Sequence, residues 1–236
     1  MKNSTWYYAA LTGALTLFAN VSIQAEPKNA EPSLPSANVA KWDELLTPDL
    51  SNMEFPEGVW TLENGELTAS EDKVIWTKKD FQNFILDFEF KNGPNANSGV
   101  LLYVTDTAKW IPNSVEVQLL DDSGTKWEKV DPKWKCGGIF GRVAPSKSTV
   151  KPAGEWNRCI ITCRGPHIEV VLNGEKVSSM DMTKWTSASH NPDGSEMPAW
   201  LNKPLNAHPT KGRIGFQGKH GGAPVWFRNI KIQDIP

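Results

Sequence analysis

The feature that most constrains the fold is a series of short segments in which apolar and polar residues alternate. Residues 84–90 alternate, and residues 115–119 alternate strictly, which is the period of a half-buried β-strand. The pairs Asn64-Gly65 and Asn173-Gly174 separate other apolar segments, and Asn-Gly is a favoured turn of two-residue β-hairpins. Helical periodicity is weak, apart from a short candidate helix over residues 41–46. These signals predict an all-β protein, either a sandwich or a barrel.

Composition divides the chain into three parts. Residues 1–25 have a weakly basic start at Lys2, an apolar stretch and a small residue, Ala25, suited to cleavage, a pattern that predicts a signal peptide. Residues 26–40 are rich in Pro, Ala, Ser and Asn and predict a flexible linker. Residues 41–236 show no further break. We therefore expect a single domain, periplasmic or secreted, with no membrane segment once the signal is removed.

The charge balance bears on the class of partner. The chain has 25 Lys and Arg against 27 Asp and Glu, for a formal net charge of −2. Nucleic-acid binding depends on an excess of positive charge, so we expect no nucleic-acid partner. The 11 Trp residues, of which only Trp6 lies in the leader, fit either a Trp-rich core or a surface that stacks on sugar rings. These features do not predict an oligomeric state.

The three cysteines do not form an obvious disulfide framework. Cys159 and Cys163 are four residues apart on one predicted strand, so they face the same way but lie about 13 Å apart, too far to bond to each other. Cys136 could pair with either of them. The interpretation we favour is that all three are small buried residues.

A pair of polar residues marks one strand as a candidate site. Glu116 and Gln118 alternate with apolar neighbours, so both project from the same strand face. A solvated face would explain this pattern as well as a functional site would. Asp121 follows at the end of the strand, which concentrates acceptor groups there.

Asp87 and Glu89 show the same two-residue spacing on another predicted strand. If that strand pairs near Glu116, several carboxylates share one sheet face. Such a cluster could act as an acid–base pair, hold a cation, or bind a sugar.

Other candidate residues lie on turns and at the last strand. Asn97 precedes an apolar run, and Lys219 and His220 lie in a glycine-rich loop where an imidazole could carry protons. On the last strand, alternation predicts Arg228 on one face with Ile230, opposite Phe227 and Asn229. The polar stretch from 182 to 211 is long for a loop in a compact domain, which favours a functional role.

Six short motifs then occur in an order and spacing that resemble one family, the 3-keto-disaccharide hydrolase domain family. The resemblance covers roughly residues 42–235. The motifs are residues 97–100 (NSGV), 116–121 (EVQLLD), 152–157 (PAGEWN), 172–174 (LNG), 212–217 (GRIGFQ) with His220-Gly221, and 227–232 (FRNIKI).

This resemblance implies a concanavalin-like jelly roll of two antiparallel sheets and a secreted or periplasmic enzyme acting on glycosides oxidised at C3. By position, Glu116 and Gln118 would lie on the concave sheet, with Asp121 at its edge. Asn97, His220 and Arg228 would surround the same site.

Two departures from the family pattern bear on specificity. Members of the family commonly have Arg where this chain has Tyr103, and an aromatic residue where it has Val115. We therefore expect substrate contacts that differ from those of other members.

The implied reaction is base-assisted elimination at C2 followed by hydration. We expect Glu116 and His220 to be catalytic, and a carbohydrate to be the ligand. No cofactor is firmly indicated, although a divalent cation held by Glu116 and Asp121 would serve the reaction. The expected substrate-binding residues are Glu89, Asn97, Tyr103, Gln118, Lys219 and Arg228.

Two rival functions remain on the same fold. A non-catalytic, lectin-like module would also use aromatic side chains to stack on sugars. A retaining glycosidase needs two carboxylates about 5 Å apart, and Gln118 stands where this fold usually carries the second acid. The chain also lacks GxSxG and HExxH motifs, which argues against an α/β-hydrolase and a zinc protease.

Overall fold

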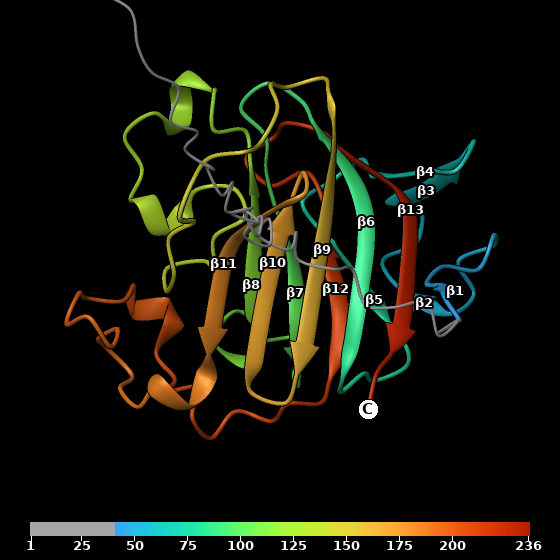
Figure 1. Cartoon of the computed structure of the whole chain (residues 1–236). Helices are drawn as coiled ribbons and strands as arrows, with labels where there is room; N and C mark the ends of the chain where they lie inside the picture. The colour runs from blue at the N-terminus through green and yellow to red at the C-terminus, as the bar shows by residue number, and fades with distance from the viewer. Residues whose placement is uncertain (1–40) are drawn as a thin grey trace, which may run out of the picture. The chain divides into compact units, whose positions relative to one another are not determined.

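The computed structural model describes residues 41–236 and shows two packed antiparallel sheets (Figure 1). The predicted signal peptide and linker lie outside the described residues. An all-β sandwich is therefore confirmed. Among residues 41–236 the helical content is limited to five 3-10 turns, and no helix there has the length and apolar character needed to cross a membrane.

One sheet has eight strands in the order β11-β10-β9-β6-β13-β4-β3, with β1 also paired to β13. Its strands are β1 (Asp43–Glu44), β3 (Trp60–Glu63), β4 (Glu66–Ala69), β6 (Phe84–Asn92), β9 (Trp156–Arg164), β10 (His167–Leu172), β11 (Glu175–Asp181) and β13 (Val225–Asp234).

The other sheet has five strands in the order β2-β5-β12-β7-β8, and most of it lies behind the first in Figure 1. Its strands are β2 (Met53–Glu54), β5 (Val74–Thr77), β7 (Asn97–Val104), β8 (Val115–Leu120) and β12 (Arg213–Gln217). The 3-10 turns are η1 (Ile111–Asn113), η2 (Thr125–Trp127), η3 (Pro132–Trp134), η4 (Met182–Lys184) and η5 (Ala199–Leu201).

The core lies between the inner faces of the two sheets. The burial of β6 alternates along its whole length, as the sequence pattern predicts. Its side chain Phe88 meets Phe216 of the other sheet edge-on, with ring centroids 5.8 Å apart. Phe227 of β13 joins the same group, 5.1 Å from Phe216. Large aromatic side chains therefore join the two layers.

Both Asn-Gly pairs form tight hairpin turns, which confirms that prediction. Asn64 and Gly65 have φ of 52° and 79°, and Asn173 and Gly174 have φ of 53° and 84°. A type I′ turn requires positive φ at both central residues, a conformation that Asn and Gly tolerate best. The turns connect β3 to β4 and β10 to β11.

Two local predictions are wrong. Residues 43–44 form β1 rather than a helix, because they pair with β13 and a six-residue helix has little stability of its own. On β13, Ile230 is buried like Phe227 instead of sharing the exposed face of Arg228. The strand register shifts between Arg228 and Lys231, and Asn229 has φ of 50°. This β-bulge reverses the alternation.

The cysteines are free and buried, which supports the interpretation that they act as small core residues. Cys159 and Cys163 both face the core from β9, and both are fully buried. Burial raises the pKa of both thiols. Cys136 is 1% exposed and also unbonded.

Candidate functional site

The candidate site lies on the outer face of the five-stranded sheet, over β7 and β8. Val117 faces the core and is fully buried, whereas Glu116 on the neighbouring position is partly exposed. Glu116 pairs with Leu101 of β7, and Gln118 pairs with Gly99. Glu116 and Gln118 therefore share the outward face, as their spacing predicts.

Glu116 fits this face because position 99 has no side chain. A Cβ atom added to Gly99 would come within 2.8 Å of Cγ and 2.9 Å of Cδ of Glu116. The side chain of Glu116 thus lies flat against the backbone of β7. Close approach of a side chain to a neighbouring strand is one reason for a glycine inside a strand.

The carboxyl of Glu116 has no compensating charge. Its carboxyl makes no hydrogen bond or ion pair with residues 41–236, and burial raises its pKa from 4.5 to about 8. Removing a carboxylate from water disfavours its charged form. Glu116 therefore carries a proton through most of the neutral pH range, although it lies on the outer face of the sheet.

Gln118 offers an acceptor to a ligand or a water molecule. Its Nε2 donates to Oδ1 of Asn97 at 2.8 Å. Its Oε1 is buried and has no hydrogen-bond partner within residues 41–236. A buried carbonyl oxygen without a donor is costly, so a bound hydroxyl or water would stabilise this position.

His220 joins the same face through the backbone. It forms an isolated antiparallel bridge with Asn97, which places it on the side of β7 opposite to β8. Its Nδ1 lies 2.8 Å from Oδ2 of Asp72. An aspartate that accepts from Nδ1 leaves Nε2 as the basic nitrogen of a neutral imidazole.

Asp72 is a site residue that sequence reasoning missed. It lies between β4 and β5, and its only local signal is an acidic residue at a turn. Its nearness to His220 arises because the segment after β12 pairs with residues 71–73: the N–H of Gly218 donates to the carbonyl of Lys73, and that of Lys219 to the carbonyl of Glu71.

The site is elongated. Asn97, beside His220, and Leu101, beside Glu116, are four residues apart on β7, a separation of about 13 Å along the strand. Glu116 and His220 also lie on opposite sides of β7. The side chain of Glu116 leans over Gly99, which is two residues, or about 7 Å along the strand, from Asn97. The carboxyl and His220 therefore share one face and lie closer together than their backbone positions.

Aromatic residues flank Glu116 on one side, across β7. Trp76 of β5 covers Gly215 of β12, where an added Cβ would come within 2.5 Å of the indole Cε3. Trp110 packs against Trp76, with centroids 6.4 Å apart, in an apolar cluster that also contains Leu101. This side of the carboxyl is therefore apolar.

A second aromatic group flanks the other side, beyond β8. The N–H of Phe140 donates to the carbonyl of Glu116. Ile139 is buried with Val117, so Phe140 faces outward with Glu116. The ring of Trp134 packs at a tilt against Phe140, with centroids 5.1 Å apart, and edge-on against Trp200, with centroids 6.2 Å apart.

Trp200 belongs to the long stretch from 182 to 211, which the sequence favours as functional. That stretch is anchored beside Phe140, because Asn191 donates from Nδ2 to the carbonyl of Gly141 at 3.1 Å. None of these aromatic residues is singled out by sequence patterns alone.

The expected gathering of Glu89 and Arg228 around Glu116 is wrong. Both lie on the outer face of the eight-stranded sheet, where Nε of Arg228 is 2.5 Å from Oε2 of Glu89. The guanidinium also covers Trp156 at 3.9 Å. The strands β6 and β13 pair with each other rather than with β8, so Glu89 and Asp87 share no face with Glu116.

The prediction that Tyr103 binds substrate is also wrong. It is fully buried, with its ring edge-on to Phe84 at 6.2 Å. Its hydroxyl donates to the carbonyl of Gly165 at 2.9 Å. Its φ of 53° turns the side chain inward near a register shift between β7 and β12. Tyr103 is therefore a core residue.

Asp121 cannot share a cation with Glu116. Five residues of strand separate the two, which is about 17 Å. Oδ2 of Asp121 accepts from the N–H of Asn95 at 2.7 Å, and Oδ1 accepts from Oγ of Ser123 at 2.6 Å. Asp121 thus holds a loop, and residues 41–236 contain no group of three or more His, Cys, Asp or Glu able to bind a metal.

Lys219 stays a predicted substrate contact. It is half-buried beside His220, and its ammonium makes no hydrogen bond or ion pair with residues 41–236.

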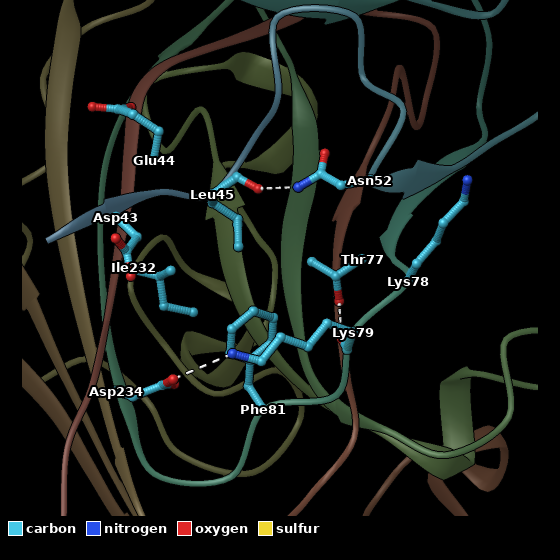
Figure 2. A pocket seen from close by; sticks show the side chains of 10 residues that line it. All are labelled: Asp43, Glu44, Leu45, Asn52, Thr77, Lys78, Lys79, Phe81, Ile232 and Asp234. Carbon is cyan, nitrogen blue, oxygen red and sulfur yellow. Dashed lines mark hydrogen bonds and ion pairs between the residues drawn. The ribbon is translucent and has the colours of Figure 1, made fainter.

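Two cavities lie away from this face. One, of about 300 Å³, opens between the sheets near β1 and β5 (Figure 2). Figure 2 shows one pair of charged groups in contact: Lys79 reaches Asp234 at 3.2 Å and lies over Phe81. The other, of about 410 Å³, is lined in part by Arg228. Neither cavity is lined by Glu116, Gln118 or His220.

Comparison with known proteins bears on this site. No curated protein matches the chain. A crystal structure of a candidate glycosyl hydrolase from Parabacteroides distasonis ATCC 8503 is 50% identical, with a TM-score of 0.81, and covers 83% of this chain and 100% of that one. A second candidate glycosyl hydrolase from the same organism is 26% identical, with a TM-score of 0.64, and covers 79% and 90% of the two chains.

The family model of the 3-keto-alpha-glucoside-1,2-lyase-like domain matches residues 34–233 of this chain. That range includes β7, β8 and the segment that carries His220. With this match over most of its length, the chain belongs to the 3-keto-alpha-glucoside-1,2-lyase-like domain family.

Proposed function

We propose that this protein cleaves glycosides whose sugar is oxidised at C3, by removal of the C2 proton and loss of the anomeric substituent. Family membership and the 50% identical relative support a glycoside-active protein. The observation that carries the finer proposal is Glu116: a protonated carboxyl without a counter-ion, between polar and aromatic groups on one face.

The chemistry needs one proton removed and one delivered. A carbonyl at C3 acidifies the proton on C2, and a base that takes it leaves an enolate. The enolate expels the anomeric oxygen, which needs a proton to leave, and water then adds to the unsaturated sugar. Correctly placed acids and bases accelerate such steps about 10²- to 10⁴-fold.

The geometry favours distinct roles for the two candidate groups. Glu116 is protonated at neutral pH, so we assign it as the acid that protonates the leaving oxygen. His220, oriented by Asp72, is the base at C2. Lys219 is the remaining candidate for charge stabilisation at the enolate oxygen, since Arg228 lies on the other sheet.

A conventional retaining mechanism fits this face less well. It requires two carboxyl groups about 5–5.5 Å apart. Gln118 occupies the next outward position of β8, and Asp72 lies beyond His220. The elimination route needs only one carboxyl near the reacting bond.

The direct test compares wild type with Glu116→Gln on a 3-keto-glucoside that carries a chromogenic aglycone. We expect aglycone release to fall at least about 100-fold, while Glu63→Gln, an exposed glutamate on β3, keeps the wild-type rate. Equal rates for wild type and Glu116→Gln would refute the role of Glu116.

Two further readouts separate the roles. Deuterium at C2 should slow wild-type turnover, because that bond breaks during elimination. If Glu116 acts as the acid, the rate of aglycone release should decline above about pH 8, because its carboxyl then loses the proton. A rate that rises through the same pH would make Glu116 the base instead.

A lectin-like module is the second candidate, favoured by the aromatic pairs Trp76–Trp110 and Trp134–Phe140 beside polar side chains. It predicts sugar binding without turnover. Calorimetry with glucosides and 3-keto-glucosides, alongside the release assay, separates the two functions.

We also propose export through the predicted signal at residues 1–25. Expression of the full chain in a bacterial host followed by mass measurement of the periplasmic protein should show a mature chain beginning at Glu26. A full-length protein found in the cytoplasm would contradict this.

A further inference from the structure

Exposed apolar groups gather at one end of the face that carries Glu116. Ile111 of η1 and Trp200 of η5 are 38% and 50% exposed. The two turns contact each other. Trp200 packs edge-on against Trp134, and Trp134 packs at a tilt against Phe140. Trp134 and Phe140 are less exposed than Trp200. An aromatic surface therefore runs outward from Glu116.

The polar groups near this end are already engaged. Nζ of Lys203 donates to Oδ1 of Asn113 at 2.5 Å. Arg142 is buried, and its Nη1 donates to Sδ of Met197 at 3.0 Å. Few groups are left to satisfy the hydroxyls of a sugar, and unsatisfied hydroxyls are costly in contact with apolar surface. A flat aromatic ring suits this surface better.

The opposite end of the face is polar. It carries the open acceptor Oε1 of Gln118, the amide of Asn97 and the imidazole of His220. A sugar with several hydroxyls suits that end. Glu116 lies between the two ends, where the bond from sugar to aglycone would lie.

We infer that the substrates are aryl glycosides, with the aromatic aglycone bound on Trp200 and Trp134. This inference rests on the proposed function and adds the class of leaving group to it. The carboxyl of Glu116 then faces the oxygen that joins the sugar to the aromatic ring.

The test measures the selectivity of Trp200→Ala. Its substrates are phenyl and methyl 3-keto-glucosides, and the quantity is the ratio of their kcat/KM values. We expect this ratio to fall about 3- to 10-fold, the range that one aromatic contact supports, and Trp200→Phe to restore it. Trp42→Ala removes a tryptophan that is 41% exposed near β1 and should leave the ratio unchanged. A ratio that Trp200→Ala does not alter overturns the inference.

A binding measurement separates this inference from the reaction itself. Unoxidised phenyl glucoside is titrated into wild type and Trp200→Ala. Weaker binding by the variant supports the aromatic subsite even if no 3-keto-glucoside is cleaved, in which case only the proposed reaction fails. Equal binding by both proteins overturns the subsite, whatever the turnover result.

Discussion

The residue with the largest consequence for pH is Glu116. Its pKa is about 8 in the folded protein and 4.5 when unfolded. A group whose pKa is raised by folding keeps its proton in the folded state while the unfolded chain releases it. The folded state therefore loses stability as pH rises from about 4.5 to about 8.

Glu116→Gln should remove this loss. We expect the variant and wild type to have similar Tm values near pH 4.5, and the variant to become the more stable protein as pH approaches 8. Thermal unfolding across that range measures the difference. Parallel Tm curves would contradict a desolvated carboxyl at this position.

Gly99 is the second residue with a specific expectation. Gly99→Ala places a Cβ against Glu116, so the carboxyl must move. A displacement of about 1 Å can lower a catalysed rate about 100-fold. We expect a loss of that order in aglycone release while the far-ultraviolet circular dichroism stays unchanged. Wild-type activity in a folded Gly99→Ala protein would show that the position of Glu116 does not matter.

At the scale of elements, one buried amide is among the contacts that attach the stretch from 182 to 211 to the rest of the domain. Oδ1 of Asn191 accepts from Nε1 of Trp185 at 2.8 Å, and its Nδ2 reaches the carbonyl of Gly141. Asn191→Ala leaves both partners unsatisfied, which costs about 1–3 kcal/mol each.

We expect Asn191→Ala to lower the free energy of unfolding and to speed proteolytic cleavage between 182 and 211. Urea denaturation and limited proteolysis with mass analysis measure the two effects. As a control, Thr186→Ala changes an exposed residue of the same stretch. Equal cleavage of all three proteins would show that the amide does not anchor the stretch.

At the scale of the whole molecule, stability depends on the packed sandwich and not on disulfides. The thiols of Cys136, Cys159 and Cys163 are buried and free, and burial raises the pKa of each. We expect a thiol reagent to label none of them in the native protein and all three in denaturant, with a Tm that a reductant does not change. A lower Tm with reductant would indicate a bridge.

The strands and hairpin turns could be predicted from the sequence, because alternation and Asn-Gly turns depend only on neighbours in the chain. The outward pairing of Glu116 and Gln118 followed for the same reason. The bulge at Asn229 could not be foreseen, since the conformation of one residue reverses the face of those after it. Nor does the sequence place Tyr103 in the core, because its positive φ depends on the register of β7 and β12.

By itself the sequence determined the all-β class, the faces of most strands and the presence of a polar pair on β8, since these follow from local periodicity. Only the tertiary structure decided which polar groups meet. It put Glu89 and Arg228 on the opposite sheet and brought Asp72 to His220 and Trp200 to Trp134. Strand order depends on contacts between distant segments, and a local pattern of apolar and polar residues does not determine which distant segments pair.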